Sequence, residues 1–448
     1  MDYKEIRLTN DPAGHCLNST QCFSRDDQWI VYDSRNEDGG IISAGEIAMV
    51  NTRDGRIVSL YKTLNQGPFG PGVGAASFSP VTDRVLFIHG IRNAGETRPY
   101  SFTRRTGVAI DTRSPFKPVF MDARSIDPPY LPGVLRGGTH AHSWSGDGQW
   151  ISFTYNDYLL EQLEKAGEPV RDLRTIGVMA PGKRVIVKED AGLENNSGEL
   201  FALLIANVTE NPVPGTDEIE KAFDECWVGK NGYRRADGSV QYRAIAFQGH
   251  LRQAGGGLKT EIFLADIPED IVERAAGMPV SDDAASRPAV PEGIRVRRIS
   301  FTEKGVSSVP RHWLRSTADG NLIGFLAEDA QGFIQLFGIS PLAGEGEAGK
   351  KPRQLTSHSF SIQGPFNFSP DGRYVAYTAD NSVWITEVGT GKSFRVSPRF
   401  KEEERPVGAV SWSNDGKTLC YNRRVETGSD AGGPGYLQIF LIRPFPKG

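Results

Sequence analysis

Residues 368–377 read Phe-Ser-Pro-Asp-Gly-Arg-Tyr-Val-Ala-Tyr, which places a tight Asp-Gly turn between an aromatic residue and a run of β-formers. Short apolar runs on both sides of such a turn are typical of a β-hairpin. Two more runs of the same character follow at 382–387 and 393–396. The stretch therefore predicts an antiparallel meander of four short strands.

This unit recurs along the chain. Its aromatic first residue is found in five close copies and two weaker ones: Phe23, Phe78, Trp144, Phe368 and Trp412, then Trp227 and Trp313. The first and last lie 412 − 23 = 389 residues apart, so six intervals average about 65 residues, more than the roughly 40 to 50 of a bare blade. Seven meanders predict an all-β chain that forms one domain over 1–448, a seven-bladed β-propeller of four-stranded antiparallel blades.

The two ends of the chain are predicted to share the last blade. The last copy supplies only three strands, at 410–412, 418–421 and 436–442, and the pattern at 5–9 supplies the fourth. Closing the ring in this way leaves no open seam between the first and last blades.

Insertions account for the extra length, at about 189–222 and 266–292. In the first insertion, Thr216 is a residue that caps helices, and Ile219, Ala222 and Phe223 follow it at helical spacing. We therefore predict a short helix over 216–223. The second insertion is rich in Ala, Pro and Asp, and we expect it on the outer surface.

The composition excludes several classes of partner. Among 448 residues, 51 basic and 55 acidic side chains give a net charge of 51 − 55 = −4, so neither nucleic acid nor a membrane is expected as a partner. No apolar run approaches the roughly 18 residues of a membrane span, and the first residues lack the apolar stretch of a signal peptide, so we expect a cytoplasmic protein. The four cysteines form no Cys-x-x-Cys pair and are predicted to be free and buried.

The seven histidines are predicted to lie on one face of the propeller, on connections that enter innermost strands or follow second strands. His140 and His142 are two apart on an extended segment, so their side chains are expected to point the same way. With His312 and His358 from other blades, and Gln363 as a fourth ligand, they predict a site for a divalent metal. The alternative is that these imidazoles cap loops and bond backbone carbonyls without a metal.

Arginines gather in the same connections and favour a small anionic ligand, because guanidinium groups bind carboxylates with two parallel hydrogen bonds. We predict that Arg35, Arg136 and Arg252 bind this ligand, with Tyr155 at the same rim. The predicted catalytic residues are Arg311 and His250, the latter as a neutral base that faces the metal from another blade.

The turn at 368–372, the Tyr-Val-Ala-Tyr run after it and the Gln-Leu-Thr segment at 354–356 resemble the repeats of TolB-like propellers. The segments Gly-Gly-Thr-His-Ala-His-Ser-Trp (137–144) and Asn-Val-Thr-Glu-Asn-Pro (207–212) resemble the YidR-like family of bacterial propellers. The chain is also similar, more distantly, to oligogalacturonate lyase, a seven-bladed propeller whose divalent metal, typically manganese, is held by three histidines and a glutamine. This similarity implies a manganese-dependent lyase that acts on an acidic saccharide.

Two functions are consistent with these features. The first is a metal-dependent lyase that acts on a uronate at the histidine-rich mouth of the central channel, where the metal and the arginines stabilise the developing enolate. The second is a non-catalytic propeller that binds a protein or a small ligand as a scaffold, with the insertion at 216–224 as its contact surface.

Overall fold

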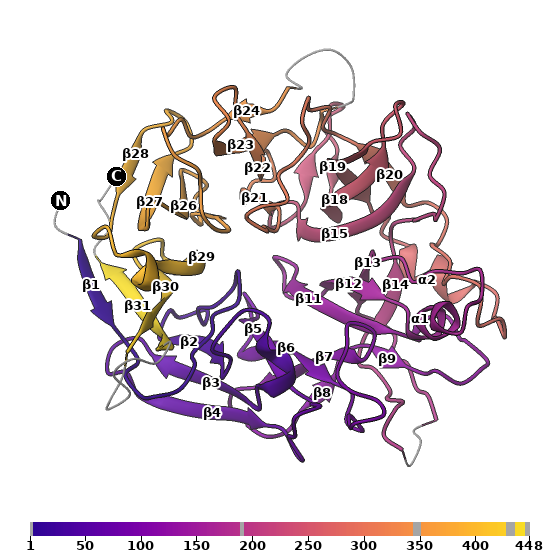
Figure 1. Ribbon diagram of the computed structural model, residues 1–448. Coiled ribbons are helices and arrows are strands. Elements are labelled where there is room, and N and C mark those ends of the chain that lie inside the picture. Colours follow the sequence, from indigo (N-terminus) through magenta and orange to yellow (C-terminus); the bar gives the residue numbers. More distant parts are fainter. Residues whose placement is uncertain (1–2, 189–191, 344–350, 427–434, 444–448) are drawn as a thin grey trace.

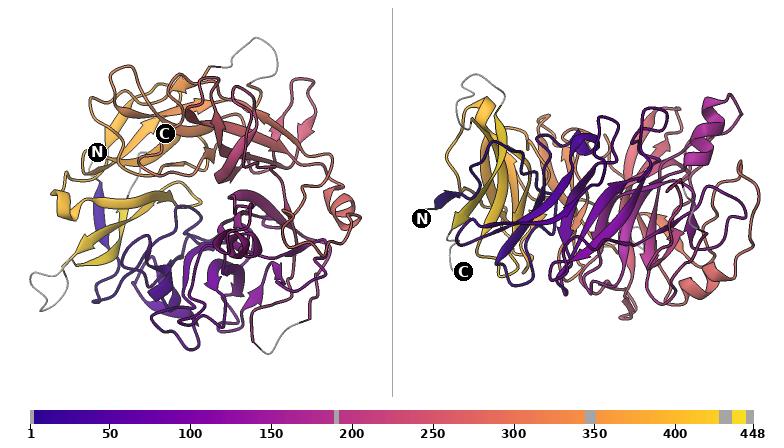
Figure 2. Two further views of the ribbon diagram at one scale, coloured as in Figure 1. Left: turned by 45° about the vertical axis from the view of Figure 1, so that its right-hand side comes forward. Right: turned by 90° about the horizontal axis from the view of Figure 1, so that it is seen from below.

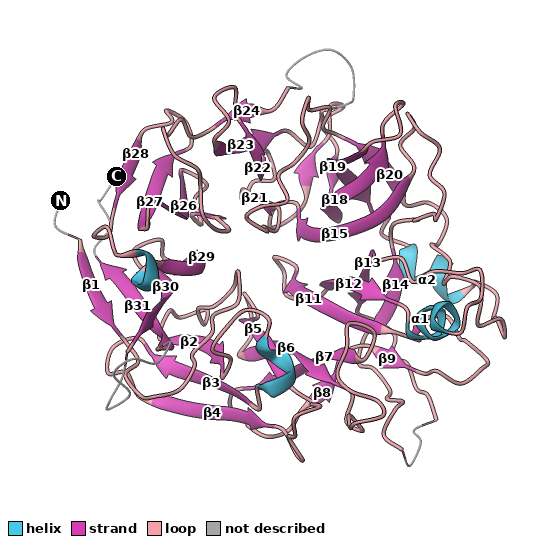
Figure 3. Cartoon of the chain, in the orientation of Figure 1, coloured by secondary structure: helices cyan, strands magenta, loops and turns pink. Residues whose placement is uncertain are grey.

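Seven small sheets surround a common axis in the computed structural model (Figure 1). The structure describes residues 3–188, 192–343, 351–426 and 435–443. In each blade, consecutive strands pair antiparallel from the axis outward. This confirms the predicted seven-bladed propeller, and strands and loops make up almost all of the chain (Figure 3).

The first three blades lie in the first half of the chain. Blade 1 contains β2 (Trp29–Asp33), β3 (Glu46–Asn51) and β4 (Ile57–Lys62), behind an inner segment that forms single bridges at Cys16 and Phe23. Blade 2 contains β5 (Val73–Phe78), β6 (Arg84–Gly90), β7 (Arg105–Asp111) and β8 (Val119–Phe120). Blade 3 contains β11 (Gly138–Trp144), β12 (Ile151–Asn156), β13 (Thr175–Ala180) and β14 (Phe201–Leu204). A short parallel pair precedes it, β9 (Ala123–Arg124) and β10 (Val134–Leu135).

The remaining blades complete the ring. Blade 4 contains β15 (Ile219–Trp227), β18 (Ala244–Arg252), β19 (Leu258–Asp266) and β20 (Arg295–Arg298), with a small hairpin of β16 (Tyr233–Arg234) and β17 (Val240–Gln241). Blade 5 contains β21 (Arg315–Ser316), β22 (Ile323–Glu328), β23 (Ile334–Ile339) and β24 (Arg353–Gln354). Blade 6 contains β25 (Asn367–Phe368), β26 (Tyr374–Ala379), β27 (Ser382–Glu387) and β28 (Ser393–Arg395). Blade 7 contains β29 (Pro406–Trp412), β30 (Leu419–Val425), β31 (Tyr436–Arg443) and β1 (Lys4–Arg7).

The N-terminal strand closes the ring, as the sequence predicts. β1 pairs antiparallel with β31, with Lys4 opposite Arg443 and Arg7 opposite Phe440. From β30, the Tyr421 hydroxyl donates a hydrogen bond to the Glu5 carboxylate, and Arg423 lies 3.3 Å from the same group. Blade 7 therefore joins the two ends of the chain and removes the open edge.

The repeated serine and aspartate have a direct structural role in the turn between the first two strands. In blade 6, Ser369 Oγ donates to Asp371 Oδ1 at 2.5 Å and accepts from the Tyr374 amide at 2.9 Å. The same arrangement recurs at Ser24, Ser145 and Ser413, and Thr317 replaces serine in blade 5. Because the side chains bond the turn's own amides, the motif fixes the hairpin locally.

The predicted helix over 216–223 is wrong, because residues 219–227 form β15, the innermost strand of blade 4. Pairing with β18 satisfies this backbone and buries Ile219 and Ala222 against blade 3, an interaction that outweighs the local helical spacing. The helices lie elsewhere: α1 (Tyr158–Lys165), α2 (Ile271–Ala276) and the 3-10 turns η1 (Gly40–Ser43) and η2 (Glu402–Glu404). No helix of the described ranges is long and apolar enough to cross a membrane.

The insertion after β19 lies at the rim of the ring, where it carries α2 (Figure 1). Its later part packs on blade 3: the Tyr130 amide donates to the Ser281 carbonyl at 2.7 Å, and Arg136 donates to the carbonyls of Asp283 and Ser286 at 3.1 and 2.7 Å. α1 and α2 lie at opposite faces of the ring (Figure 2, right).

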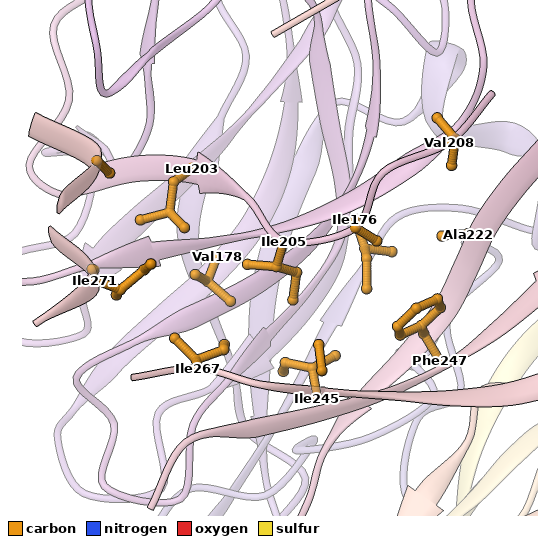
Figure 4. Close-up of a cluster of buried hydrophobic side chains, with 14 of the residues drawn as sticks. Ile176, Val178, Leu203, Ile205, Val208, Ala222, Ile245, Phe247, Ile267 and Ile271 are labelled. Atoms are coloured by element: carbon orange, nitrogen blue, oxygen red, sulfur yellow. The ribbon is translucent and has the colours of Figure 1, made fainter. Parts of the chain in front are cut away.

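The largest apolar core lies between blades 3 and 4. Ile176 and Val178 of β13 pack against Ile245 and Phe247 of β18, and Ile271 brings α2 into the same cluster (Figure 4). Each such buried side chain contributes about 1.5 to 3 kcal/mol. This core fixes the position of the strand ends that carry the candidate site. The four cysteines are free and buried, as predicted.

Candidate functional site

The upper face is defined as the face at which the innermost strands begin, and α1 lies on it (Figure 2, right). The predicted metal ligands lie toward this face, and His312, His358 and Gln363 are hydrogen-bonded within their own blades. His312 Nδ1 lies 3.1 Å from the Pro310 carbonyl and its Nε2 accepts from the Leu326 amide at 3.1 Å. His358 Nε2 lies 2.6 Å from the Tyr377 hydroxyl. Gln363 exchanges hydrogen bonds of 2.8 and 3.0 Å with Asn381.

A bulge interrupts β11 between His140 and Ser143, and Ala141 has a φ of +55°. The simple alternation expected for His140 and His142 is therefore broken. His142 Nε2 lies 3.0 Å from Thr139 Oγ1, and Nδ1 of both histidines has no hydrogen-bond partner in the described part of the chain. Nowhere in the described ranges do three His, Cys, Asp or Glu side chains meet in a metal-binding group. The three-histidine metal site therefore stays a prediction.

Most of the predicted ligand-binding arginines have structural partners. Arg35 forms a buried ion pair with Asp33 at 2.7 Å. Arg136 pairs with Asp157 at 3.0 Å, and the Tyr155 hydroxyl donates to the same carboxylate at 3.0 Å. These contacts fix the ends of β2 and β12 and engage the guanidinium groups of Arg35 and Arg136 within the protein. The sequence cannot distinguish such arginines from ligand-binding ones because both lie in the same connections.

Three other cations on the upper face have no carboxylate partner among the residues that the structure describes. Arg105, which begins β7, donates to the Tyr100 hydroxyl at 2.9 Å, and its Nη2 has no partner although the side chain is only 4% exposed. Arg174, which precedes β13, donates to Asn156 Oδ1 at 3.1 Å. Lys221 of β15 lies over the Phe223 ring.

These cations interact with one another and with Arg311. Burial and the charges of Arg174 and Arg311 lower the pKa of Arg105 to about 10. Burial and the same two arginines also lower the pKa of Lys221. Arg311 itself forms a two-pronged ion pair with Asp224, at 2.6 and 3.2 Å. We call Arg105, Arg174, Lys221 and Arg311 the cationic cluster.

Two further ionisable side chains lie beside the cationic cluster. His140 contacts the exposed Phe102 ring edge-on at 5.9 Å, and burial together with the charges of Arg105 and Arg174 holds its pKa well below the ordinary value. Its imidazole is therefore neutral at physiological pH. Glu225 of β15 is buried, and one of its oxygens has no partner among the described residues.

A polar cavity of about 360 Å³ opens beside the cationic cluster, between blades 3 and 4. We call it the blade 3–4 cavity. Both cations and acids line it: Arg171, Arg174, Lys221 and Arg252, and Asp172, Glu210 and Glu220, together with Asn156 and Leu173. Of the predicted residues, Arg252 lies here, paired with Glu220 at 2.7 Å, and His250 lies opposite Lys221 across the strand pair. Burial and the charge of Lys221 lower the pKa of His250 to about 4.

The structure thus places two of the predicted residues at the cationic cluster, Arg311 and His140. The sequence analysis did not identify the other ionisable residues there, which are Arg105, Arg174, Lys221 and Glu225. For Glu225, the repeat in the sequence did contain a signal. The residue three before the aromatic position has a positive φ in blades 2, 3 and 4, at Ala75, Ala141 and Asp224. With Trp227 as the aromatic position of blade 4, as the repeat already indicates, Asp224 and Glu225 fall on the inner strand that ends at Trp227.

Comparisons with known proteins agree with this architecture. A family model described as a protein of unknown function (DUF3748) matches residues 72–194. The uncharacterized protein YidR of Escherichia coli (strain K12) is 34% identical over 421 residues, which cover 93% of this chain and 94% of YidR. The chain belongs to the YidR family. The stretch matched by the family model contains Arg105, His140 and Arg174.

Among solved structures, an oligogalacturonate lyase in complex with manganese has a TM-score of 0.54 at 12% identity, covering 98% of this chain and 93% of the lyase. TolB from Acinetobacter baumannii has a TM-score of 0.38 at 12% identity, covering 100% and 97%. At such identities the likeness to the lyase concerns the fold, which this YidR family member shares.

Proposed function

We propose that this protein binds an acidic saccharide of the uronate class at the cationic cluster and cleaves it by elimination. The observation that carries the proposal is that Arg105, Arg174 and Lys221 form no ion pair with a carboxylate of the described residues. Gathering like charges in a partly buried place costs free energy, and a bound carboxylate relieves that cost. The fold of the oligogalacturonate lyase supports this choice of ligand.

The proposed chemistry is removal of a proton from the carbon next to the carboxylate. Arg105 and Arg174 hold the carboxylate and stabilise the negative charge that develops on it. His140, neutral because of its lowered pKa, accepts the proton. His250, predicted for this role from the sequence, is neutral as well but lies at the side of Lys221.

The related fold of a manganese-bound lyase raises the question of a metal here. His312 has both ring nitrogens in hydrogen bonds, and no three His, Cys, Asp or Glu side chains of the described residues gather in one group, so the donor set does not fit a three-histidine site. The proposed step therefore relies on arginines for positive charge.

Incubation with oligogalacturonates, with ultraviolet detection of unsaturated products and calorimetry of binding, tests the proposal. The wild type is expected to bind and to form product, and Arg105→Ala and Arg174→Ala to lose both. Arg113→Ala is the matched control, because Arg113 follows the other end of β7 and pairs with Asp111 at the surface. Binding without product would favour the alternative, a non-catalytic propeller; no binding would refute the proposal.

A further inference from the structure

Glu225 is a buried acid on the innermost strand of blade 4. It follows Asp224, whose φ of +51° belongs to the bulge of β15. Its side chain is 3% exposed; Oε2 accepts a hydrogen bond from the Thr154 hydroxyl at 2.8 Å, and Oε1 has no partner in the described ranges. A buried carboxyl oxygen without a partner is costly, so it calls for an explanation.

Glu225 and the neighbouring Asp224 have different hydrogen-bond partners. Arg311 forms its two hydrogen bonds with Asp224 and none with Glu225. Burial and the charge of Asp224 raise the pKa of Glu225 to about 7, although the Thr154 hydrogen bond and Arg311 act in the opposite direction. The ionisable groups that face it are Asp224, Cys226, Arg174, Arg311 and Arg315. Asp224 is therefore held by an ion pair, whereas Glu225 keeps one carboxyl oxygen without a partner among the described residues.

We infer that Glu225 is the acid that protonates the leaving oxygen of the saccharide, an inference that rests on the proposed function. The carbon next to the carboxylate gives its proton to His140, and the electron pair of that bond forms a double bond to the neighbouring carbon. The bond from this carbon to the glycosidic oxygen breaks, and the oxygen takes the proton of the Glu225 carboxyl group. Solvent then returns a proton to Glu225 and removes one from His140. No oxidant or reductant is involved.

Thr154 is a positioning residue in this arrangement. Its hydroxyl donates to Oε2, which leaves Oε1 as the oxygen that carries and delivers the proton. Thr154→Ser keeps the hydroxyl and is expected to retain activity within about twofold, whereas Thr154→Val is expected to lower kcat with little change in KM.

Two substrates with different leaving groups test whether Glu225 acts as an acid or has only a structural role. With an oligogalacturonate, Glu225→Gln is expected to lower kcat by about 100-fold or more and to leave KM within about twofold of the wild type. With a synthetic uronate that carries an aryl leaving group, which departs without protonation, the same variant is expected to recover to within about tenfold of the wild type. Glu328→Gln, an exposed glutamate of blade 5, is the control.

The possible failures are distinguishable. Equal loss with both leaving groups, or no loss with either, overturns the acid role while wild-type elimination upholds the proposed function. A wild type that eliminates neither substrate overturns the proposed function, and the acid role with it. The pH profile adds a second criterion: wild-type kcat on the oligogalacturonate should decline above about pH 7 and the aryl substrate should lack this decline.

Discussion

Glu194 and Arg124 lie 70 residues apart in sequence and form an ion pair of 2.8 Å, with side chains 3% and 0% exposed. Arg104 binds the same carboxylate at 2.7 Å. The neighbouring Asn196 pairs through the backbone with Arg124. A segment that leaves blade 3 thus returns to the outer edge of blade 2 and joins the two blades.

Glu194→Gln is expected to destabilise the protein by about 3 to 5 kcal/mol, because it leaves two buried guanidinium groups without their shared carboxylate. Denaturant unfolding measures this change. Glu96→Gln, at an exposed position of blade 2, is the control and should change stability by less than about 0.5 kcal/mol.

The same ion pair predicts a dependence of stability on pH. Burial alone raises the pKa of Glu194, but Arg124 and Arg104 outweigh it and lower the pKa to about 2. A carboxylate with a lowered pKa contributes stability above its ordinary pKa and loses it as the pH falls toward 2. The difference in unfolding free energy between wild type and Glu194→Gln should therefore shrink between about pH 4.5 and 2. A constant difference would contradict the pairing.

The cationic cluster is expected to lower the stability of the ligand-free protein and to allow it to bind a uronate. Arg105→Met removes a buried charge that has no carboxylate partner in the described structure, so the ligand-free protein should be as stable as the wild type or more so. Uronate should raise wild-type stability by about 2.7 kcal/mol at one hundred times its Kd, and should leave the variant unchanged. Thermal unfolding with and without ligand measures both effects, and ligand stabilisation of Arg105→Met would argue against the cluster as the binding site.

Metal analysis tests the ligand set that the sequence predicted. Since His312 has both ring nitrogens in hydrogen bonds and the described residues form no group of three possible ligands, the purified protein should hold less than one divalent metal per chain, and uronate binding should survive a chelator. One equivalent of manganese that His140→Ala/His142→Ala removes would restore the three-histidine interpretation.

The N-terminal strand predicts a further outcome. Deleting residues 1–9 exposes the edge of β31 and removes the Glu5 contacts, so unfolding should occur at lower denaturant and the protein should associate through the open edge. Light scattering and denaturant unfolding measure these effects. A synthetic peptide of residues 1–9 should restore the monomer.

The sequence was sufficient for the architecture because its repeat encodes a local structure. Ser369 and Asp371 fix their turn through hydrogen bonds to neighbouring amides, and the same hydroxyl–aspartate turn is found in five blades. Blade closure was predictable for the same reason, since residues 5–9 match other outermost strands.

The candidate site was predicted only in part because pairing across blades has no local signature. Arg136 and Arg105 both precede or begin strands at the upper face, yet one has Asp157 as its partner and the other has no carboxylate among the described residues. Similarly, helical spacing over 216–223 gave no hint that β18 would supply hydrogen bonds to a strand there. Residue type and spacing located the face, and long-range contacts decided the roles.

The pairing of β1 with β31 also has a consequence for biosynthesis. Lys4 leaves the ribosome 443 − 4 = 439 residues ahead of its partner Arg443. Blades 1 to 6 can assemble in order as they emerge, but β1 must wait for its partner β31. The nascent chain therefore carries β1 unpaired until β31 has emerged, and the ring can be completed only after that point.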